Sequence, residues 1–250
     1  MTSSRYHRQI IIPYFGEDGQ RKLERAKVLV VGAGGLGSPV ISYLAAAGVG
    51  RIGVVDHDTV EITNLNRQII HAGNIGENKA ISAVKYINRL NPEVEAVAYP
   101  YKLDPDNVLE TLRPWDVVVS CVDSMALRFL INDACYLLGK PMVHAAVFET
   151  EGEASTFTYK DDSPCYRCIY PKEVEQPTPG IFGFTAGFFG TIQAAETVKL
   201  LAGFGELLEG KLLRVDLQTM EWFEIDISRR NDCPICSGKI REIRPENYNV

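Results

Sequence analysis

Three glycines, Gly32, Gly34 and Gly37, have the G-x-G-x-x-G spacing of a phosphate-binding loop. Glycine lets the backbone turn tightly there and approach a phosphate, and the amides and dipole at the start of a following helix favour an anion. Asp56 follows the next apolar run, where such folds place a carboxylate on a ribose hydroxyl. The pattern predicts a nucleotide site but does not separate ATP from NAD. Close helix–sheet packing is the alternative role of the glycines.

Polar and basic residues continue beyond Asp56. Asp58 is followed by the run Asn64-Leu65-Asn66-Arg67-Gln68, and Lys79 opens the next helical stretch. Near the carboxyl ends of parallel strands, Arg67 and Lys79 could stabilise charge on an α-phosphate and on leaving pyrophosphate. A nicotinamide enzyme has little use for two such cations. Asp123 ends another apolar run and is a candidate Mg²⁺ ligand, with a helix N-cap as its alternative role. We therefore favour nucleotidyl transfer from ATP over an NAD-dependent oxidoreductase.

Four of the six cysteines form two CxxC pairs, Cys165/Cys168 and Cys233/Cys236. Paired CxxC motifs suit a closed tetrahedral Zn²⁺ site, so the sequence predicts a structural zinc centre. Two disulfides are the alternative, which a reducing compartment disfavours. Cys121 and Cys135 are predicted to be buried structural thiols.

The bulk composition excludes several kinds of partner. The net charge is -6 and the isoelectric point is about 5.3, which argues against nucleic acid or an anionic membrane as the main partner. The start, MTSSRYHRQI, lacks the apolar core of a signal peptide, and no stretch approaches the roughly 20 apolar residues of a membrane span. We expect a cytoplasmic protein that binds neither nucleic acid nor membrane.

The elements that must position these residues alternate between strands and helices. A strand at 27–31, the glycine loop, a helix through Ala47 and a strand at 51–55 form a βαβ unit. The order predicts an α/β fold of Rossmann-like type with a mostly parallel sheet, and an antiparallel extension after Gly152. Further predicted strands are 95–99, 116–120, 141–146, 154–159, 211–216 and 221–227; further predicted helices are 17–26, 77–90, 125–139 and 188–202.

We interpret residues 1–250 as a single domain. Its predicted parts are an N-terminal helical segment (1–26), a nucleotide-binding βα part (27–150), a part with the predicted zinc site (151–236) and a flexible tail (237–250). The proline- and glycine-rich stretch 171–187 is predicted to be a long mobile loop.

Taken in order, these motifs make the chain resemble the MoeB/ThiF/HesA group of enzymes, which are relatives of ubiquitin-activating enzymes, over nearly its whole length. MoeB-type members are the most similar by overall pattern. The resemblance rests on the Val-Gly-Ala-Gly-Gly-Leu-Gly loop, Asp56-x-Asp58, Lys79, Asp123 and three longer stretches: Arg5-Tyr6-His7-Arg8-Gln9-Ile10, Asn64-Leu65-Asn66-Arg67-Gln68 and Pro164-Cys165-Tyr166-Arg167-Cys168.

The resemblance implies a homodimeric adenylyltransferase that uses Mg-ATP. Its implied partner is a small β-grasp sulfur-carrier protein ending in Gly-Gly, on which it forms an acyl-adenylate with release of pyrophosphate. Residues 1–250 would form one adenylation domain, in which 151–236 binds the carrier as well as zinc. Asp123 would hold magnesium, and Arg8 would reach the partner's ATP across the dimer; a surface arginine is the alternative role of Arg8. The implied nucleotide-binding set is Gly34, Gly35, Asp56, Asp58, Asn64, Asn66, Arg67, Gln68, Lys79, Asp123 and Ser124.

One feature of the family is missing. Many relatives carry a thioester-forming or persulfide-forming cysteine before a Gly-rich stretch, where this chain has Gln176. We therefore expect adenylylation without a carrier–enzyme thioester. The acceptor stays open, because molybdopterin, thiamin and tRNA-thiolation pathways, and enzymes that adenylylate peptides, use similar domains. A non-catalytic half of a heterodimer is a further alternative, which the retained glycine loop and Asp123 disfavour.

Overall fold

The fold is described from a computed structural model, which places residues 5–173 and 180–248. A single eight-stranded sheet has the order β3-β2-β1-β4-β5-β6-β7-β8. Strands β1 to β5 run parallel, and β6 to β8 extend the sheet in antiparallel fashion. The predicted α/β, Rossmann-like sheet with its antiparallel extension is confirmed.

The element bounds follow the predicted ones closely. The strands are β1 Lys27–Val31, β2 Arg51–Val55, β3 Glu95–Tyr99, β4 Val117–Ser120, β5 Met142–Phe148, β6 Glu151–Phe157, β7 Lys211–Asp216 and β8 Glu221–Asp226. The α-helices are α1 His7–Ile10, α2 Gly16–Arg25, α3 Gly37–Ala47, α4 Lys79–Leu90, α5 Val108–Leu112, α6 Met125–Leu138, α7 Tyr166–Ile169 and α8 Gly183–Ala202. Short 3-10 helices are η1 Ile62–Asn64, η2 Ile69–His71 and η3 Pro245–Asn247.

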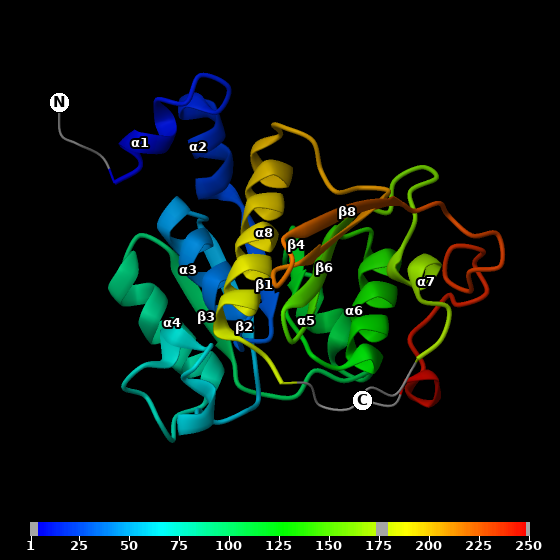
Figure 1. Cartoon of the computed structure of the whole chain (residues 1–250), viewed down its shortest axis with the longest axis horizontal. Helices are drawn as coiled ribbons and strands as arrows, with labels where there is room; N and C mark the ends of the chain where they lie inside the picture. The colour runs from blue at the N-terminus through cyan, green and yellow to red at the C-terminus, as the bar shows by residue number, and fades with distance from the viewer. Residues whose placement is uncertain (1–4, 174–179, 249–250) are drawn as a thin grey trace.

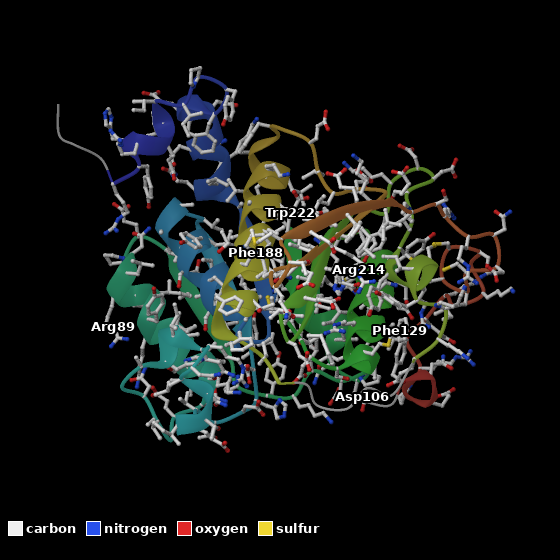
Figure 2. The ribbon with its side chains drawn as sticks, viewed as in Figure 1. Arg89, Asp106, Phe129, Phe188, Arg214 and Trp222 are labelled. Atoms are coloured by element: carbon white, nitrogen blue, oxygen red, sulfur yellow. The ribbon has the colours of Figure 1, made fainter. Side chains whose placement is uncertain are left out.

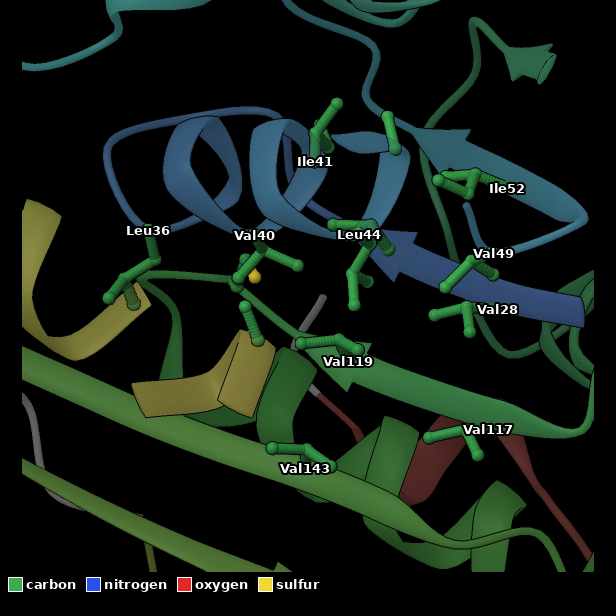
Figure 3. Close-up of a cluster of buried hydrophobic side chains, with 14 of the residues drawn as sticks. Val28, Leu36, Val40, Ile41, Leu44, Val49, Ile52, Val117, Val119 and Val143 are labelled. Atoms are coloured by element: carbon green, nitrogen blue, oxygen red, sulfur yellow. The ribbon is translucent and has the colours of Figure 1, made fainter. Parts of the chain in front are cut away.

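Helices cover both faces of the sheet, and this is why its central strands are almost wholly apolar. On one face, α2, α3, α4 and α8 pack against residues such as Val28 and Val119. Figure 3 shows Val40 and Leu44 of α3 over these two strand residues. On the other face, α5 and α6 cover a second cluster around Trp115. Figure 1 shows α8 in front of the sheet, with α1 and α2 together at one end of the molecule.

The prediction of a mobile loop over 171–187 is wrong at its C-terminal end. Helix α8 begins at Gly183, five residues before the predicted helix start at 188. Two glycines of α8 allow close packing. A Cβ on Gly183 would lie 2.3 Å from the Asn66 carbonyl oxygen, and one on Gly190 would lie 2.4 Å from the Leu36 carbonyl oxygen. Tertiary contact therefore offsets the low helical propensity of glycine. Residues 174–179, which include Gln176, lie outside the described residues.

Two further expectations differ from the structure. Strand β6 begins at Glu151 rather than 154, since a tight turn with Glu149 at φ +49° joins it directly to β5. The tail is anchored near its described end, because Tyr248 is only 8% exposed and packs against the α6 face of the sheet. Among the described residues, no helix is long and apolar enough to cross a membrane.

Candidate active site

The candidate site lies where the strand order reverses, between β1 and β4, which is the usual ligand crevice of an open α/β sheet. The glycine loop follows β1, and Asp123 follows β4. The two loops touch: a Cβ on Gly32 would lie 2.6 Å from the Cys121 carbonyl oxygen. Gly32 also has φ +96°, a conformation that side chains rarely adopt. The sheet topology thus brings two predicted parts of the site together.

Asp56 shapes the glycine loop. Its Oδ2 accepts a hydrogen bond from the Ala33 amide at 2.8 Å, and its Oδ1 accepts from the Asp58 amide at 2.9 Å. A Cβ on Gly37 would lie 2.1 Å from the Gly32 carbonyl oxygen, so the start of α3 closes directly over the loop. The N-terminus of α3 therefore lies directly at the loop, where its dipole favours an anion.

His71 supports the same loop, and the sequence analysis missed it. The ring is fully buried, with Nε2 2.7 Å from the Ala33 carbonyl oxygen and Nδ1 2.8 Å from Ser82 Oγ. Burial lowers the pKa of His71, so the neutral ring donates from Nε2 and accepts at Nδ1. A histidine in an apolar run was the only sequence signal for this role.

Asp58 and Lys79 form an ion pair, with 2.9 Å between Oδ2 and Nζ. Burial tends to raise the pKa of Asp58, but the hydrogen bond and charge of Lys79 outweigh it and lower the pKa. The Lys79 side chain is 8% exposed, whereas that of Asp58 is 53% exposed. Asn78 fixes the pair, because its Nδ2 donates to the Asp56 and Asp58 carbonyls while its Oδ1 caps α4. The ammonium is therefore held in place at the rim of the site.

Arg67 and Gln68 lie against the glycine loop. A Cβ on Gly35 would lie 3.3 Å from Arg67 Cγ, and one on Gly34 would lie 3.7 Å from Gln68 Nε2. Arg67 Nη1 binds Asn66 Oδ1 at 2.7 Å, so Asn66 aims the guanidinium. Gln68 is 4% exposed, and its Oε1 has no hydrogen-bond partner among the described residues. This orphaned acceptor beside the loop fits a site built for a ligand.

Asp123 stands exposed at the edge of the crevice. The alternative role of this residue as a helix cap does not hold, because Ser124 caps α6 by accepting from the Leu127 amide at 3.3 Å. Asn64 is engaged in the capping box of η1. The carboxylate of Asp123 thus remains available for a cation.

Arg8 does not join these residues within its own chain. It lies in α1 and is exposed, and the neighbouring Gln9 donates to the Ala47 carbonyl at 2.8 Å. Ala47 ends α3, whereas the glycine loop lies at the opposite end of that helix. The Tyr6 hydroxyl, bound by Asn91 at 2.8 Å, fixes the segment there.

The four paired cysteines converge in one buried cluster. Their sulfurs lie 3.6 Å (Cys165 to Cys233), 3.7 Å (Cys168 to Cys236) and 3.9 Å (Cys165 to Cys168) apart. Tetrahedral zinc with bonds of about 2.3 Å spaces its sulfurs about 3.8 Å apart, whereas a disulfide bond is about 2.05 Å long. The distances fit a Cys₄ metal site and rule out the alternative of two disulfides.

A buried ion pair adjoins the cysteine cluster. Asp133 of α6 is fully buried and accepts from Arg167 Nη2 at 2.8 Å and from the Tyr248 hydroxyl at 2.8 Å. Arg167 lies between two of the cysteines and stacks 4.4 Å over the Phe129 ring. Asp133 therefore joins α6, the cysteine cluster and the tail.

A family model described as the ThiF family matches residues 6–235. The chain belongs to the ThiF family. Among its relatives, the sulfur carrier protein adenylyltransferase of Thermus thermophilus is 44% identical, with 94% of this chain and 91% of the relative aligned. The SAMP-activating enzyme E1 of Haloferax volcanii is 42% identical, with 98% of this chain and 93% of that relative aligned. The family and the enzyme class predicted from the sequence are thereby confirmed.

Other relatives of this ThiF-family chain are longer. The mouse adenylyltransferase and sulfurtransferase MOCS3 is 43% identical over 98% of this chain but only 55% of its own length, so the chain spans about half of that protein. Among solved structures, Escherichia coli MccB with ATP superposes with a TM-score of 0.85, at 23% identity over 94% of this chain and 75% of MccB. That likeness supports the fold alone.

The ThiF-family chain also exposes aromatic residues around α8 and β8. Phe182 and Phe184 stack at 5.1 Å and are 56% and 57% exposed. Phe188 of α8 packs edge-on against Trp222 of β8 at 5.4 Å, and Figure 2 labels both. We use the name aromatic groove for the hollow of about 710 Å³ lined by the β5–β6 turn, residues around 181–184 and the turn after β7, including Glu149, Thr150, Ile181, Phe182, Phe184 and Leu217.

Proposed function

We propose that this protein uses ATP to adenylylate the C-terminal glycine carboxylate of a small ubiquitin-like sulfur-carrier protein. The observation that carries the proposal is the convergence of the glycine loop, Arg67, the Asp58–Lys79 pair and Asp123 at the strand-order reversal. Relatives more than 40% identical over nearly the whole chain, named for sulfur-carrier and SAMP activation, support the acceptor class.

The chemistry needs positioned charge more than a general base. A C-terminal carboxylate, with an ordinary pKa of about 3.5, is already ionised at neutral pH. One of its oxygens attacks the α-phosphorus of ATP, the bond to the bridging oxygen breaks, and pyrophosphate leaves with the released electron pair. Arg67 and Lys79 stabilise the negative charge that builds on the phosphates. The product is a mixed anhydride that a sulfur nucleophile can attack.

The nucleotide lies along the crevice in this proposal. Loop amides near Gly34 and Gly35 bind phosphate oxygens, and Asp56 binds the ribose. Each Asp56 oxygen already accepts one backbone hydrogen bond, but a carboxylate has about four acceptor positions and retains capacity for a hydroxyl. Gln68 Oε1 is available to accept a hydrogen bond from the nucleotide. Asn64, Asn66 and Ser124 act mainly by shaping the loops.

Magnesium fits the exposed carboxylate of Asp123, since Mg²⁺ commonly takes one or two carboxylates together with phosphate oxygens and water. Bound there, it would neutralise charge on the triphosphate. Zinc fits the Cys₄ cluster, where Cys165, Cys168, Cys233 and Cys236 would hold it in a structural role.

We propose that the reaction proceeds without an enzyme-bound thioester. Cys121 is the cysteine next to the glycine loop, but it is 7% exposed, contacts Gln193 Oε1, and burial raises its pKa. Burial likewise raises the pKa of Cys135. Neither thiol has the exposed, thiolate-favouring surroundings of a nucleophile. All six cysteines are free of disulfides, which suits a reducing cytoplasm.

The carrier tail is proposed to enter through the aromatic groove. Gly183 begins α8 directly after Phe182 and packs against the Asn66 carbonyl, so the groove adjoins the loop that holds Arg67. An extended Gly-Gly end could reach the α-phosphate along that path. Two copies of the chain are proposed to form a homodimer in which the exposed Arg8 of each serves the other's nucleotide.

Carrier-dependent ATP–pyrophosphate exchange tests the proposal. Purified protein is mixed with Gly-Gly-ending carriers, and label is followed from pyrophosphate into ATP. The matched control is each carrier without its last glycine. Exchange that requires the intact carrier supports the proposal; no exchange with any carrier, or exchange driven by a short peptide alone, contradicts the assigned acceptor.

A further inference from the structure

Arg128 is an arginine buried beneath the candidate site, on a helix that is otherwise mostly apolar. It lies in α6, five residues after Asp123, and is 9% exposed. Its Nε and Nη2 both donate to the carbonyl oxygen of Val122, at 3.2 Å and 2.9 Å. The desolvation of a charge is costly. A buried guanidinium that donates two hydrogen bonds to one main-chain carbonyl therefore requires an explanation.

The carbonyl that Arg128 holds belongs to the peptide immediately before Asp123. On the other side of Asp123, Ser124 is fixed as the cap of α6. Upstream, the Cys121 carbonyl lies against Gly32, and the Cys121 amide donates to the Val31 carbonyl at 2.8 Å. The main chain on both sides of Asp123 is therefore held, while its side chain stays exposed at the crevice.

A carboxylate balances the buried charge. Glu153 of β6 is close enough to Arg128 for their charges to interact, and it accepts from the Tyr170 hydroxyl at 2.6 Å and from His144 Nε2 at 3.4 Å. Burial tends to raise the pKa of Glu153, but His144, Tyr170 and the charge of Arg128 together lower it, so Glu153 is ionised. Burial lowers the pKa of His144, which is therefore neutral and donates from Nε2. The negative charge of Glu153 thus offsets part of the buried positive charge of Arg128.

We propose that Arg128 is a positioning residue for adenylylation: by fixing the Val122 carbonyl it presents the Asp123 carboxylate to the magnesium of bound ATP. This inference rests on the magnesium role of Asp123 in the proposed function. A lysine keeps the charge but lacks the planar fork of two donors, so it cannot restrain the carbonyl in the same way. In this role Arg128 acts through the main chain beside Asp123 rather than by binding nucleotide or carrier itself.

The test compares Arg128→Lys, Asp123→Asn and the double variant in calorimetric titrations of ATP binding at a series of magnesium concentrations, without carrier. The matched control is Arg167→Lys, a buried arginine on the same side of the sheet that does not contact the Asp123 loop. Melting temperature and zinc content report on folding for each variant.

We expect Arg128→Lys to raise the magnesium concentration for half-maximal ATP binding about tenfold, the effect of about one charge-assisted hydrogen bond. The double variant should bind no worse than Asp123→Asn, because residues that act as one unit are not additive. Arg167→Lys should leave the magnesium requirement unchanged. The inference would be overturned if the effects of the two substitutions on ATP binding multiply in the double variant. It would also be overturned if the magnesium requirement is unchanged in Arg128→Lys or in Asp123→Asn. Since no carrier is present, a missing exchange reaction would contradict the proposed function alone.

Discussion

At the nucleotide edge of the sheet, Asp123 and Asp58 are exposed and Arg67 is only half-buried. At the cysteine cluster, by contrast, four sulfurs and the Asp133 carboxylate are buried and already partnered. The first region leaves polar groups accessible to a ligand that arrives and departs, whereas the second is buried and has its polar groups bonded to one another. The comparison teaches that changes in the first region should reduce activity at constant stability, while changes in the second should reduce stability first.

The largest expected effect lies at the nucleotide edge. Arg67→Ala and Asp123→Ala should each reduce carrier-dependent exchange by at least about 10²–10³-fold, because charge stabilisation at the reacting phosphates is lost. Their melting temperatures should stay near that of the parent, since both side chains are partly or fully exposed. Arg89→Ala, an exposed arginine near the end of α4 in Figure 2, is the control. Parent-like exchange in either variant would refute its assigned role.

The next effect lies at the cysteine cluster. Cys233→Ser should lose bound metal, measured as zinc per chain, and should lower the melting temperature by about 10 °C or more, because a structural site contributes folding free energy. Exchange should fall in proportion to the folded fraction. Cys135→Ala, which removes a buried thiol outside the cluster, should retain zinc. A metal-free variant with parent-like stability would contradict the structural role.

A smaller effect is expected where the tail meets α6. Tyr248→Phe removes one hydrogen bond to the buried carboxylate of Asp133, which costs about 1.5–3 kcal/mol and lowers the melting temperature by several degrees. Exchange at low temperature should be unchanged. Tyr43→Phe, at a 56% exposed tyrosine, should have almost no effect. Equal melting temperatures for the two variants would show that the tail does not contribute to stability.

The smallest effect should come from the remaining thiols. Cys121→Ala and Cys135→Ala should each keep exchange within about twofold of the parent, because buried structural thiols act only through packing. Loss of exchange in a folded Cys121→Ala protein would instead assign a chemical role to that thiol and reopen the question of a covalent intermediate.

Much of the fold could be predicted because its signals are local. The apolar runs of β1, β2 and β4 alternate with helical stretches, and glycine spacing marks the loop between β1 and α3. The Cys₄ cluster was also predictable, since CxxC pairs bring their own geometry. The rule that ligands bind at the carboxyl ends of strands predicted a shared crevice for the polar residues, whereas the strand order that places Asp123 beside the glycine loop comes from the structure.

The contacts that the sequence analysis missed depend on residues far apart in the chain. The start of α8 resembled a loop because glycines such as Gly183 have low helical propensity, and only the packing of Gly183 against Asn66 explains its place there. His71 and Arg128 resembled ordinary helix or core positions. Their roles become apparent only through the carbonyls of Ala33 and Val122, which no sequence pattern indicates.

The most direct test of the central claim is to follow which phosphorus of ATP reaches the carrier. The protein, magnesium and a Gly-Gly-ending carrier are incubated with ATP labelled either at the α-phosphate or at the γ-phosphate, and the intact carrier is analysed after rapid quenching. Adenylylation predicts α-label on the carrier, removed by thiols, and γ-label recovered only as pyrophosphate. Label from the γ-phosphate on the carrier, or no label from either position, would contradict the account.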